Sequence, residues 1–191
     1  MLNIEENITR KTDLANEDSL SAFKNHAAQQ SHNAYRVFYD FLAEVNPSQI
    51  LEIGTGLGGF TSFLKICCDD LELSTSILSF DIHEKSWFDE TRAMGIDIRI
   101  EDVFLEDYTG LRQDIIEYIQ SDGTTIALCD GGNKINEFKT LSEHIKINDF
   151  IMAHDYVEDT NIFREKIYQK IWNWCEITEN DISPSCEKYN L

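Results

Sequence analysis

Short apolar runs alternate with amphipathic stretches from residue 49 onward. The apolar runs read QILEI, SILSFDI, IDIRI, TTIALCD and DFIMAHDY, and the stretches between them carry apolar residues at helical spacing. Parallel strands need a crossover connection to return the chain, and a helix usually supplies it. The alternation therefore predicts an α/β fold with a doubly wound, mostly parallel, Rossmann-like sheet flanked by helices.

Two further helical segments are predicted outside this alternating region. Residues 19–45 carry apolar side chains at helical spacing and Pro47 ends the run, so we expect one broken helix or two. Residues 161–174 form a second candidate helix after the cap-like sequence DTN. We expect an N-terminal helical cap over residues 1–46 and one compact domain over residues 47–191.

The tail after the last predicted helix offers only CEIT and CEKYN as candidate strands. Either these strands are minimal, or the chain is cut short of its natural end. In the second case a strand edge would be exposed, which would favour a homodimer.

The chain is strongly acidic, with 16 basic and 35 acidic residues and a formal net charge of −19. This charge repels phosphate backbones and anionic membranes, so nucleic acid and membranes are poor candidate partners. The polar N-terminus does not read as a signal peptide, and the five cysteines show no paired CxxC spacing. We therefore expect a cytoplasmic protein with reduced thiols.

A glycine-rich turn, LEIGTGLGGF, stands between the first predicted strand and its helix. Gly54, Gly56 and Gly59 also satisfy GxGxxG, the fingerprint of NAD enzymes, so an NAD-dependent oxidoreductase stays an alternative. Glu52 lies on the strand just before the turn, where a carboxylate suits a cationic ligand and is unfavourable beside a pyrophosphate. A buried charge costs several kcal/mol unless it is paired, so Glu52 should have a ligand or a dedicated partner.

The stretch LEIGTGLGG resembles motif I of the class I S-adenosylmethionine-dependent methyltransferases. The resemblance continues at SILSFDIHE, where Asp81 matches the carboxylate that holds both ribose hydroxyls. It continues again at IRIEDVF, where Asp102, or Glu101 in its place, matches the acidic residue facing the adenine amino group. The resemblance covers residues 47–157 and implies these cofactor-binding residues: Glu52, Gly54, Thr55, Gly56, Gly58, Asp81, Asp102 and Asp130.

Two later strands each end in a carboxylate. TTIALCD ends in Asp130, and DFIMAHDY contains Asp155 with His154 beside it. The carboxyl ends of parallel strands line one crevice, so these side chains should face the same opening. Two carboxylates and an imidazole can hold a divalent cation, with magnesium or manganese favoured by the oxygen ligands.

This acidic pairing is similar to the metal site of the catechol, macrocin and cephalosporin-biosynthesis O-methyltransferases. In those families an acidic pair follows the fifth strand, whereas this chain has His154 and Asp155 there. The candidate metal ligands are therefore Asp130, His154 and Asp155, and the presence and identity of the metal stay open. The alternative is that Asp130 serves the active site without a metal and His154 is an ordinary packed histidine.

The resembling families place a basic side chain about three residues after the first aspartate. In those families it serves as the base. Asn133 stands there and Lys134 is next to it, so Lys134 is the candidate base and, with Asp130, a catalytic candidate, although an exposed Lys134 would be only a solvated lysine. The resemblance implies methyl transfer from S-adenosylmethionine to a hydroxyl of a small-molecule acceptor, with help from a divalent cation such as Mg2+. A metal-independent N- or C-methyltransferase and a non-catalytic S-adenosylmethionine-binding module are the alternatives.

Trp172 and Trp174 are expected to pack the last predicted helix against the sheet. The alternative is that they form an aromatic wall for the acceptor.

Overall fold

A five-stranded parallel sheet forms the centre of the molecule, which is known from a computed structural model that describes residues 2–10 and 21–191. The strands run in the order β6-β5-β4-β7-β8, so the direction of winding reverses between β4 and β7. Ligand crevices form at this kind of reversal in doubly wound sheets. The predicted parallel sheet is confirmed, with strands β4 (Gln49–Ile53), β5 (Ser76–Asp81), β6 (Asp97–Ile100), β7 (Thr125–Cys129) and β8 (Phe150–Ala153).

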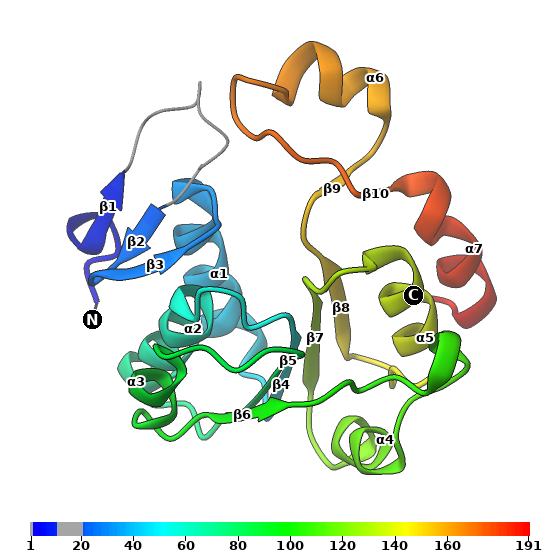
Figure 1. Cartoon of the computed structure of the whole chain (residues 1–191), viewed down its shortest axis with the longest axis horizontal. Helices are drawn as coiled ribbons and strands as arrows, with labels where there is room; N and C mark the ends of the chain where they lie inside the picture. Colours follow the sequence, from blue (N-terminus) through cyan, green and yellow to red (C-terminus); the bar gives the residue numbers. More distant parts are fainter. Residues whose placement is uncertain (1, 11–20) are drawn as a thin grey trace.

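Helices cover both faces of this sheet (Figure 1). Successive residues of a strand point to opposite faces, and β4 shows this directly. Ile50 packs into a core with residues of α1, α2 and α3, whereas Leu51 packs into a second core with residues of α4 and α5. None of the described helices is long and apolar enough to cross a membrane. The helices are α1 (His32–Val45), α2 (Gly59–Asp70), α3 (Phe88–Arg92), α4 (Gln113–Gln120) and α5 (Lys134–Ser142).

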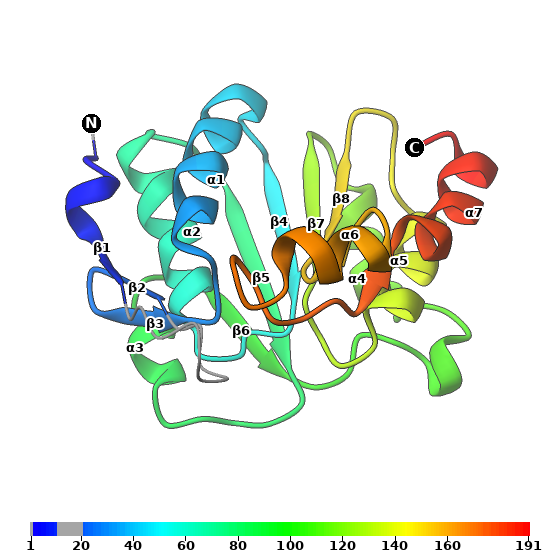
Figure 2. The ribbon, with the colours of Figure 1, turned by 90° about the horizontal axis from the view of Figure 1, so that it is seen from above.

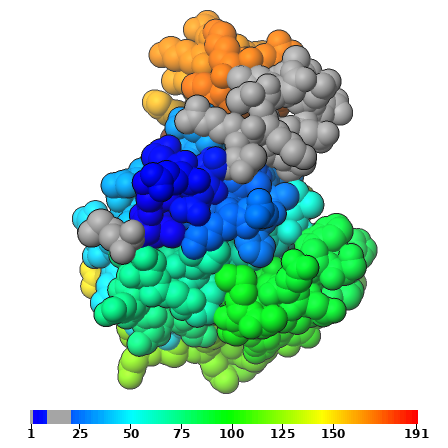
Figure 3. All heavy atoms as spheres, turned by 90° about the vertical axis from the view of Figure 1, so that its left-hand side faces the viewer, coloured from blue at the N-terminus to red at the C-terminus, as the bar shows by residue number. Residues whose placement is uncertain are grey.

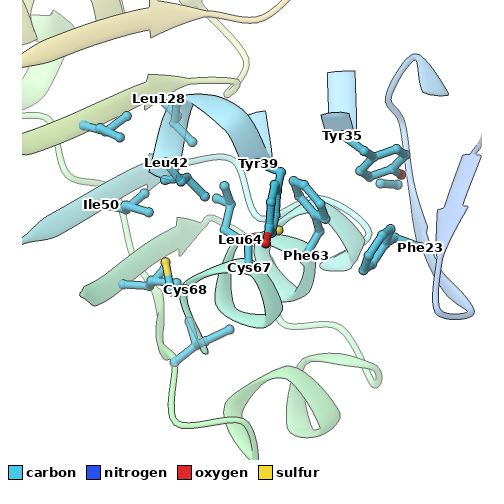
Figure 4. Close-up of a cluster of buried hydrophobic side chains, with 14 of the residues drawn as sticks. Phe23, Tyr35, Tyr39, Leu42, Ile50, Phe63, Leu64, Cys67, Cys68 and Leu128 are labelled. Carbon is cyan, nitrogen blue, oxygen red and sulfur yellow. The ribbon is translucent and has the colours of Figure 1, made fainter. Parts of the chain in front are cut away.

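The first core is dense in aromatic side chains (Figure 4). Tyr35 and Phe23 each meet the ring of Phe63 edge to face, with ring centroids 4.9 Å apart. The thiols of Cys67 and Cys68 are buried here, unpaired with each other, and burial raises the pKa of each. They act as small apolar groups, as the sequence predicted.

The prediction of helix is wrong for the N-terminal half of residues 19–45. β2 (Ser21–Phe23) and β3 (His26–Ala28) form a hairpin with a two-residue turn, and β1 (Ile8–Arg10) pairs with β2. The helix begins only at His32. The physical reason is the turn: Lys24 and Asn25 both have positive φ, the conformation of a tight hairpin turn. Figure 3 shows this segment, in blue, lying against the cyan-to-green residues that follow it. Leu20, which contributed to the helical pattern, lies outside the described residues.

The C-terminal region also departs from the prediction. The helix predicted over residues 161–174 consists of α6 (Thr160–Ile162) and a π-helical turn (Phe163–Ile167). It ends at residue 167, so Trp172 and Trp174 lie beyond it. CEIT contributes the short strand β10 (Ile177–Thr178), which pairs in parallel with β9 (Tyr156–Val157). The first four residues of CEKYN are helical, at the end of α7 (Glu179–Tyr189), and Asn190 caps this helix. Thr178 and Asp181 form the capping box that starts it. α7 lies at the opposite end of the molecule from the N-terminal strands (Figure 2).

Candidate functional site

The glycine loop is held against the ends of two neighbouring strands. The backbone N–H groups of Gly54 and Thr55 donate to the carbonyl of Phe80 at the end of β5, at 2.8 and 3.0 Å. Gly54 has φ +93°, and a Cβ there would lie 2.1 Å from the carbonyl oxygen of Asp130. Gly56 has φ +57°, and a Cβ there would meet no atom nearer than 4.0 Å, so the space where a side chain would stand is open. The loop therefore combines tight packing at its first glycine with free space in place of a side chain at its second.

The third glycine of the GxGxxG spacing has a structural explanation within this chain. A Cβ on Gly59 would lie 1.9 Å from the carbonyl oxygen of Ala27 in β3. The start of α2 thus packs directly on the N-terminal hairpin. Gly59 is accounted for by this packing, without a pyrophosphate ligand.

Asp81, at the end of β5, lies against the glycine loop. Its Oδ2 accepts hydrogen bonds from the Gly56 N–H at 3.1 Å and from Lys85 Nζ at 2.7 Å, and its Oδ1 accepts one from the His83 N–H at 3.0 Å. Burial opposes ionisation, but the bonds from Lys85 and the two N–H groups hold the pKa of Asp81 below its usual value. Asp81 is therefore a fixed carboxylate that carries a negative charge beside the glycine loop.

A cavity of about 310 Å³ opens beside this carboxylate, and we call it the glycine-loop cavity. Asp102 also lines it, with Oδ1 fixed by the N–H of Phe104 at 2.9 Å, while Glu101 pairs with Arg112 at 2.6 Å. Its other walls include the apolar side chains of Phe80, Val103 and Phe104. Of the predicted cofactor residues, the cavity brings together Gly54, Gly56, Asp81, Asp102 and Asp130, whereas Glu52, Thr55 and Gly58 do not line it.

Glu52 points to the opposite face of the sheet, toward α2. Its Oε2 accepts hydrogen bonds from Thr61 Oγ1 at 2.6 Å and from Ser79 Oγ at 2.5 Å, and the residue is only 3% exposed. Burial raises the pKa of Glu52 to about 7, although both hydroxyls oppose the rise. Glu52 thus has the dedicated partners that its burial required. Its role toward a cofactor stays a prediction.

A second cavity, of about 90 Å³, lies on the Glu52 side, and we call it the Glu52 cavity. Phe38 of α1 and Phe60 of α2 form part of its wall, and Asp130 and His154 form another part. Asp130 also borders the glycine-loop cavity. The two cavities therefore share Asp130 in their linings.

The three predicted metal ligands converge at the carboxyl ends of β7 and β8. His154 Nδ1 lies 3.1 Å from Asp130 Oδ1 and 3.2 Å from Asp155 Oδ1, and one ligand atom from each of the three residues falls within 4.8 Å of the other two. Asp155 has φ +59°, an uncommon conformation for a residue other than glycine, and such conformations cluster at functional sites. Burial alone would lower the pKa of His154, but the two carboxylates raise it to about 9.

Lys134 is buried inside this cluster. Its Nζ lies 2.6 Å from Glu176 Oε2, 3.4 Å from Asp155 Oδ2 and 3.5 Å from Asp130 Oδ1, and the side chain is 6% exposed. Burial opposes its charge, but the three carboxylates together raise the pKa of Lys134 above its usual value. Lys134 therefore keeps its proton in this arrangement, and the geometry suits a fixed cation rather than a general base.

Two acidic residues of the site were missed in the sequence. Glu137, 1% exposed, accepts hydrogen bonds from the N–H groups of Gly131 and Asn133 at 3.1 and 2.9 Å and so fixes the loop after β7. The sequence did carry a signal for Glu137, because an acidic residue in the first turn after an N-cap asparagine is placed to bind the N–H groups there. Glu176 had no such signal, because it reaches Lys134 across 42 residues of sequence.

A third cavity, of about 300 Å³, lies beyond His154, and we call it the aromatic cavity. It shares Gln30, Ala153 and His154 with the Glu52 cavity. The Glu52 cavity therefore shares Asp130 with the glycine-loop cavity and His154 with the aromatic cavity. The aromatic cavity takes its name from the side chains of Tyr156, Phe163, Trp172 and Trp174 in its lining.

Comparison with known proteins finds likeness in fold. No protein-family model and no curated protein sequence matches the chain. The apo structure of CmcI matches with a TM-score of 0.54 and 17% identity, over 76% of this chain and 60% of that one. A CmcI structure with Mg and SAM matches with a TM-score of 0.50 and 17% identity, over 72% of this chain and 57% of that one.

A third match is a putative O-methyltransferase from Nostoc punctiforme, with a TM-score of 0.50 and 11% identity, over 82% of this chain and 49% of that one. The chain thus spans about half to three fifths of the length of these structures. The predicted resemblance to this group of O-methyltransferases is confirmed at the level of the fold.

Proposed function

We propose that this chain transfers the methyl group of S-adenosylmethionine to a hydroxyl oxygen of a small-molecule acceptor. The observation that carries the proposal is the position of Asp130, which borders the glycine-loop cavity on one side and belongs to the cluster with His154 and Asp155 on the other. A methyl donor in the glycine-loop cavity and an acceptor at this cluster would both lie beside Asp130. The fold shared with CmcI, whose structure contains SAM, supports the same conclusion.

The glycine-loop cavity offers the groups that S-adenosylmethionine requires. Asp81 and Asp102 are acceptors for the hydroxyls and the amino group of an adenosine, and the apolar side chains beside them suit its base. Gly56 leaves room for the ligand to approach the backbone. To bind ribose, Asp81 must exchange its bond to Lys85 for bonds to the ligand hydroxyls. We assign Glu52 to the cofactor's ammonium from the neighbouring Glu52 cavity, with Thr55 and Gly58 supporting the loop.

Methyl transfer requires alignment of three atoms and the removal of one proton. The acceptor oxygen forms a bond to the methyl carbon, the carbon–sulfur bond breaks, and S-adenosylhomocysteine leaves. Much of the barrier reduction comes from holding the two substrates in line. Without a metal ion, we assign Asp130 as the group that takes the hydroxyl proton, and Lys134 as the cation that positions the Asp130 carboxylate.

The cluster of Asp130, His154 and Asp155 fits a divalent cation in the chemistry of its donors. Two carboxylates and one imidazole suit Mg2+ or Mn2+, and one ligand atom from each lies within 4.8 Å of the others. A bound cation would lower the pKa of an acceptor hydroxyl. For such an ion to bind, Lys134 must withdraw from Asp130 and Asp155, and Glu176 is placed to retain its ammonium.

One observation favours a second candidate function, metal-independent methyl transfer. The Lys134 ammonium lies within 3.5 Å of both Asp130 and Asp155 and already offsets part of their negative charge. In this case the cluster carries its own cation, and the same transfer proceeds without a metal ion.

The test is the formation of S-adenosylhomocysteine from S-adenosylmethionine with a panel of hydroxylated acceptors, with and without EDTA. We expect EDTA to stop the reaction and Asp155→Asn to reduce it at least about tenfold. Glu158→Gln, which neutralises an exposed carboxylate three residues away, should leave the rate unchanged. Activity that survives EDTA would establish the metal-independent reaction. Cofactor binding without turnover on any acceptor would make the chain a binding module.

A further inference from the structure

Gln30 carries a buried side-chain amide that has no partner among the described residues. It stands between β3 and α1, and the residue is 8% exposed. Its backbone carbonyl accepts a hydrogen bond from Ser21 Oγ at 2.7 Å, but no described residue bonds its side-chain amide. Buried polar groups are nearly always paired, because an unmade hydrogen bond leaves their desolvation uncompensated. The partner of this amide therefore has to come from the space that Gln30 borders.

The backbone of Gln30 is fixed by the first core. Ser21 Oγ, which donates to its carbonyl, lies 2.7 Å from the hydroxyl of Tyr35, and both of these residues are buried. The ring of Tyr35 packs against Phe23 and Phe63. A side chain that starts from a fixed backbone loses less freedom when it binds a ligand, so more of its interaction free energy appears as affinity.

A second unpaired polar atom borders the same space. Gln30 and Glu52 both line the Glu52 cavity. The hydrogen bonds that Glu52 accepts from Thr61 and Ser79 both end on Oε2, so Oε1 has no partner among the described residues. The volume of about 90 Å³ accommodates several water-sized groups, since one water molecule needs roughly 10–15 Å³. An unpaired amide and an unpaired carboxylate oxygen therefore share one small cavity.

The lining of the Glu52 cavity restricts which ligand groups can pair with these two side chains. No lysine or arginine belongs to its described lining, in which Gln30 and His154 are the side chains that carry nitrogen. His154 belongs to the cluster with Asp130 and Asp155. The amide N–H groups of Gln30 are thus the donors left for a ligand carboxylate, while the Glu52 carboxylate suits an ammonium. The pair is complementary to a zwitterionic amino-acid group.

We infer that Gln30 binds the α-carboxylate of the cofactor's amino-acid moiety, beside the ammonium that Glu52 holds. The inference rests on the proposed function and adds to it a binding residue from outside the central sheet. The Glu52 cavity shares Asp130 with the glycine-loop cavity, so a ligand with its adenosine in the glycine-loop cavity extends its amino-acid end past Asp130. The segment that precedes α1 thereby contributes directly to the cofactor site.

Three matched ligands test this inference by calorimetry. S-Adenosylhomocysteine carries the carboxylate and the ammonium, its decarboxylated analogue carries only the ammonium, and methylthioadenosine carries neither. We expect Gln30→Met to bind S-adenosylhomocysteine at least about tenfold more weakly than the wild type, because hydrogen bonds to charged groups are the stronger ones. Its affinity for the other two ligands should be unchanged. Gln113→Met, at an exposed position of α4, should bind all three ligands as the wild type does.

The melting temperature of the ligand-free proteins separates a binding role from a packing role. Gln30→Met removes an amide without a partner in the described protein, so its melting temperature should equal or exceed that of the wild type. A lower melting temperature would show that the amide is already paired and would contradict the inference.

The inference is also overturned if Gln30→Met binds S-adenosylhomocysteine unchanged, if it weakens all three ligands alike, or if the wild type binds the decarboxylated analogue as tightly as S-adenosylhomocysteine. In these cases the cofactor still binds, so the proposed function stands. Failure of the wild type to bind any of the three would overturn both. A selective loss in Gln30→Met, without methyl transfer to any acceptor, would remove the proposed function and leave the role of Gln30 intact.

Discussion

The ammonium of Lys134 lies 3.4 Å from the carboxylate of Asp155, in the cluster where the sequence predicts a divalent cation. A buried lysine and a metal ion compete for the same carboxylates, because each needs the negative charge to offset its own desolvation. Glu176, 47% exposed on its side chain, gives Lys134 a partner at the rim of the cluster. The competition between these two cations is the feature that decides whether the site uses a metal.

Lys134→Met should increase the response of the protein to Mn2+. In EDTA the variant should lose about 3 kcal/mol of unfolding free energy, because the carboxylates lose their buried cation. On addition of Mn2+ its melting temperature should rise more than that of the wild type, since ligand binding stabilises the folded state. Lys139→Met removes an exposed lysine from the same helix and serves as the control. Equal Mn2+ responses of the wild type and Lys134→Met would contradict the competition between Lys134 and a metal ion.

Gly54→Ala should disrupt the junction between the glycine loop and the loop after β7. The new Cβ would lie 2.1 Å from the Asp130 carbonyl oxygen, and φ +93° disfavours any side chain. Overpacking and backbone strain together should cost about 2–5 kcal/mol, measured by urea denaturation. Gly132→Ala is the control, since a Cβ there meets nothing within 4 Å. A Gly54→Ala protein as stable as Gly132→Ala would contradict the described loop packing.

Glu52→Gln should change the pH dependence of stability in a defined direction. Folded Glu52 holds its proton up to about pH 7, whereas the ordinary pKa is 4.5, so the folded state binds more protons between these values. The stability from this group is therefore present below 4.5 and is lost as pH rises to about 7.

Glutamine does not titrate, so the ligand-free variant should gain up to about 3 kcal/mol over the wild type between roughly pH 5 and pH 8. Urea denaturation of both proteins across this range measures the difference. Thr109→Val, at an exposed position far from Glu52 in the sequence, provides a control that should follow the wild-type profile. A constant difference between wild type and Glu52→Gln would mean that Glu52 ionises normally.

The central sheet was predictable because its strands are buried on both faces. Every residue of β7, Thr125–Cys129, is buried, and such a strand reads as one continuous apolar run. The N-terminal hairpin was not predictable in this way. Phe23 and Ala27 are spaced as on a helix, and the hairpin is set by its turn and by the contact of Ala27 with Gly59, which no local pattern reveals.

The site was predictable in its residues and less so in their contacts. Asp130, His154 and Asp155 meet because parallel strands end at one edge of a sheet. Because side chains alternate along a strand, Glu52 faces away from its neighbours Leu51 and Ile53, toward α2. The sequence does not show which cavity lies on which face of the sheet. The burial of Lys134 depends on Glu176, a partner from a distant segment.

The most direct test of the account is calorimetric titration of the protein with S-adenosylhomocysteine and, in parallel, with NAD. The account predicts binding of one S-adenosylhomocysteine per chain, and at least about tenfold weaker binding by Asp81→Asn, whose amide is a poorer acceptor for ribose hydroxyls. Asp122→Asn, at an exposed turn, should bind as the wild type does. Heat from NAD alone, or unchanged affinity in Asp81→Asn, would contradict the assignment of the glycine-loop cavity to S-adenosylmethionine.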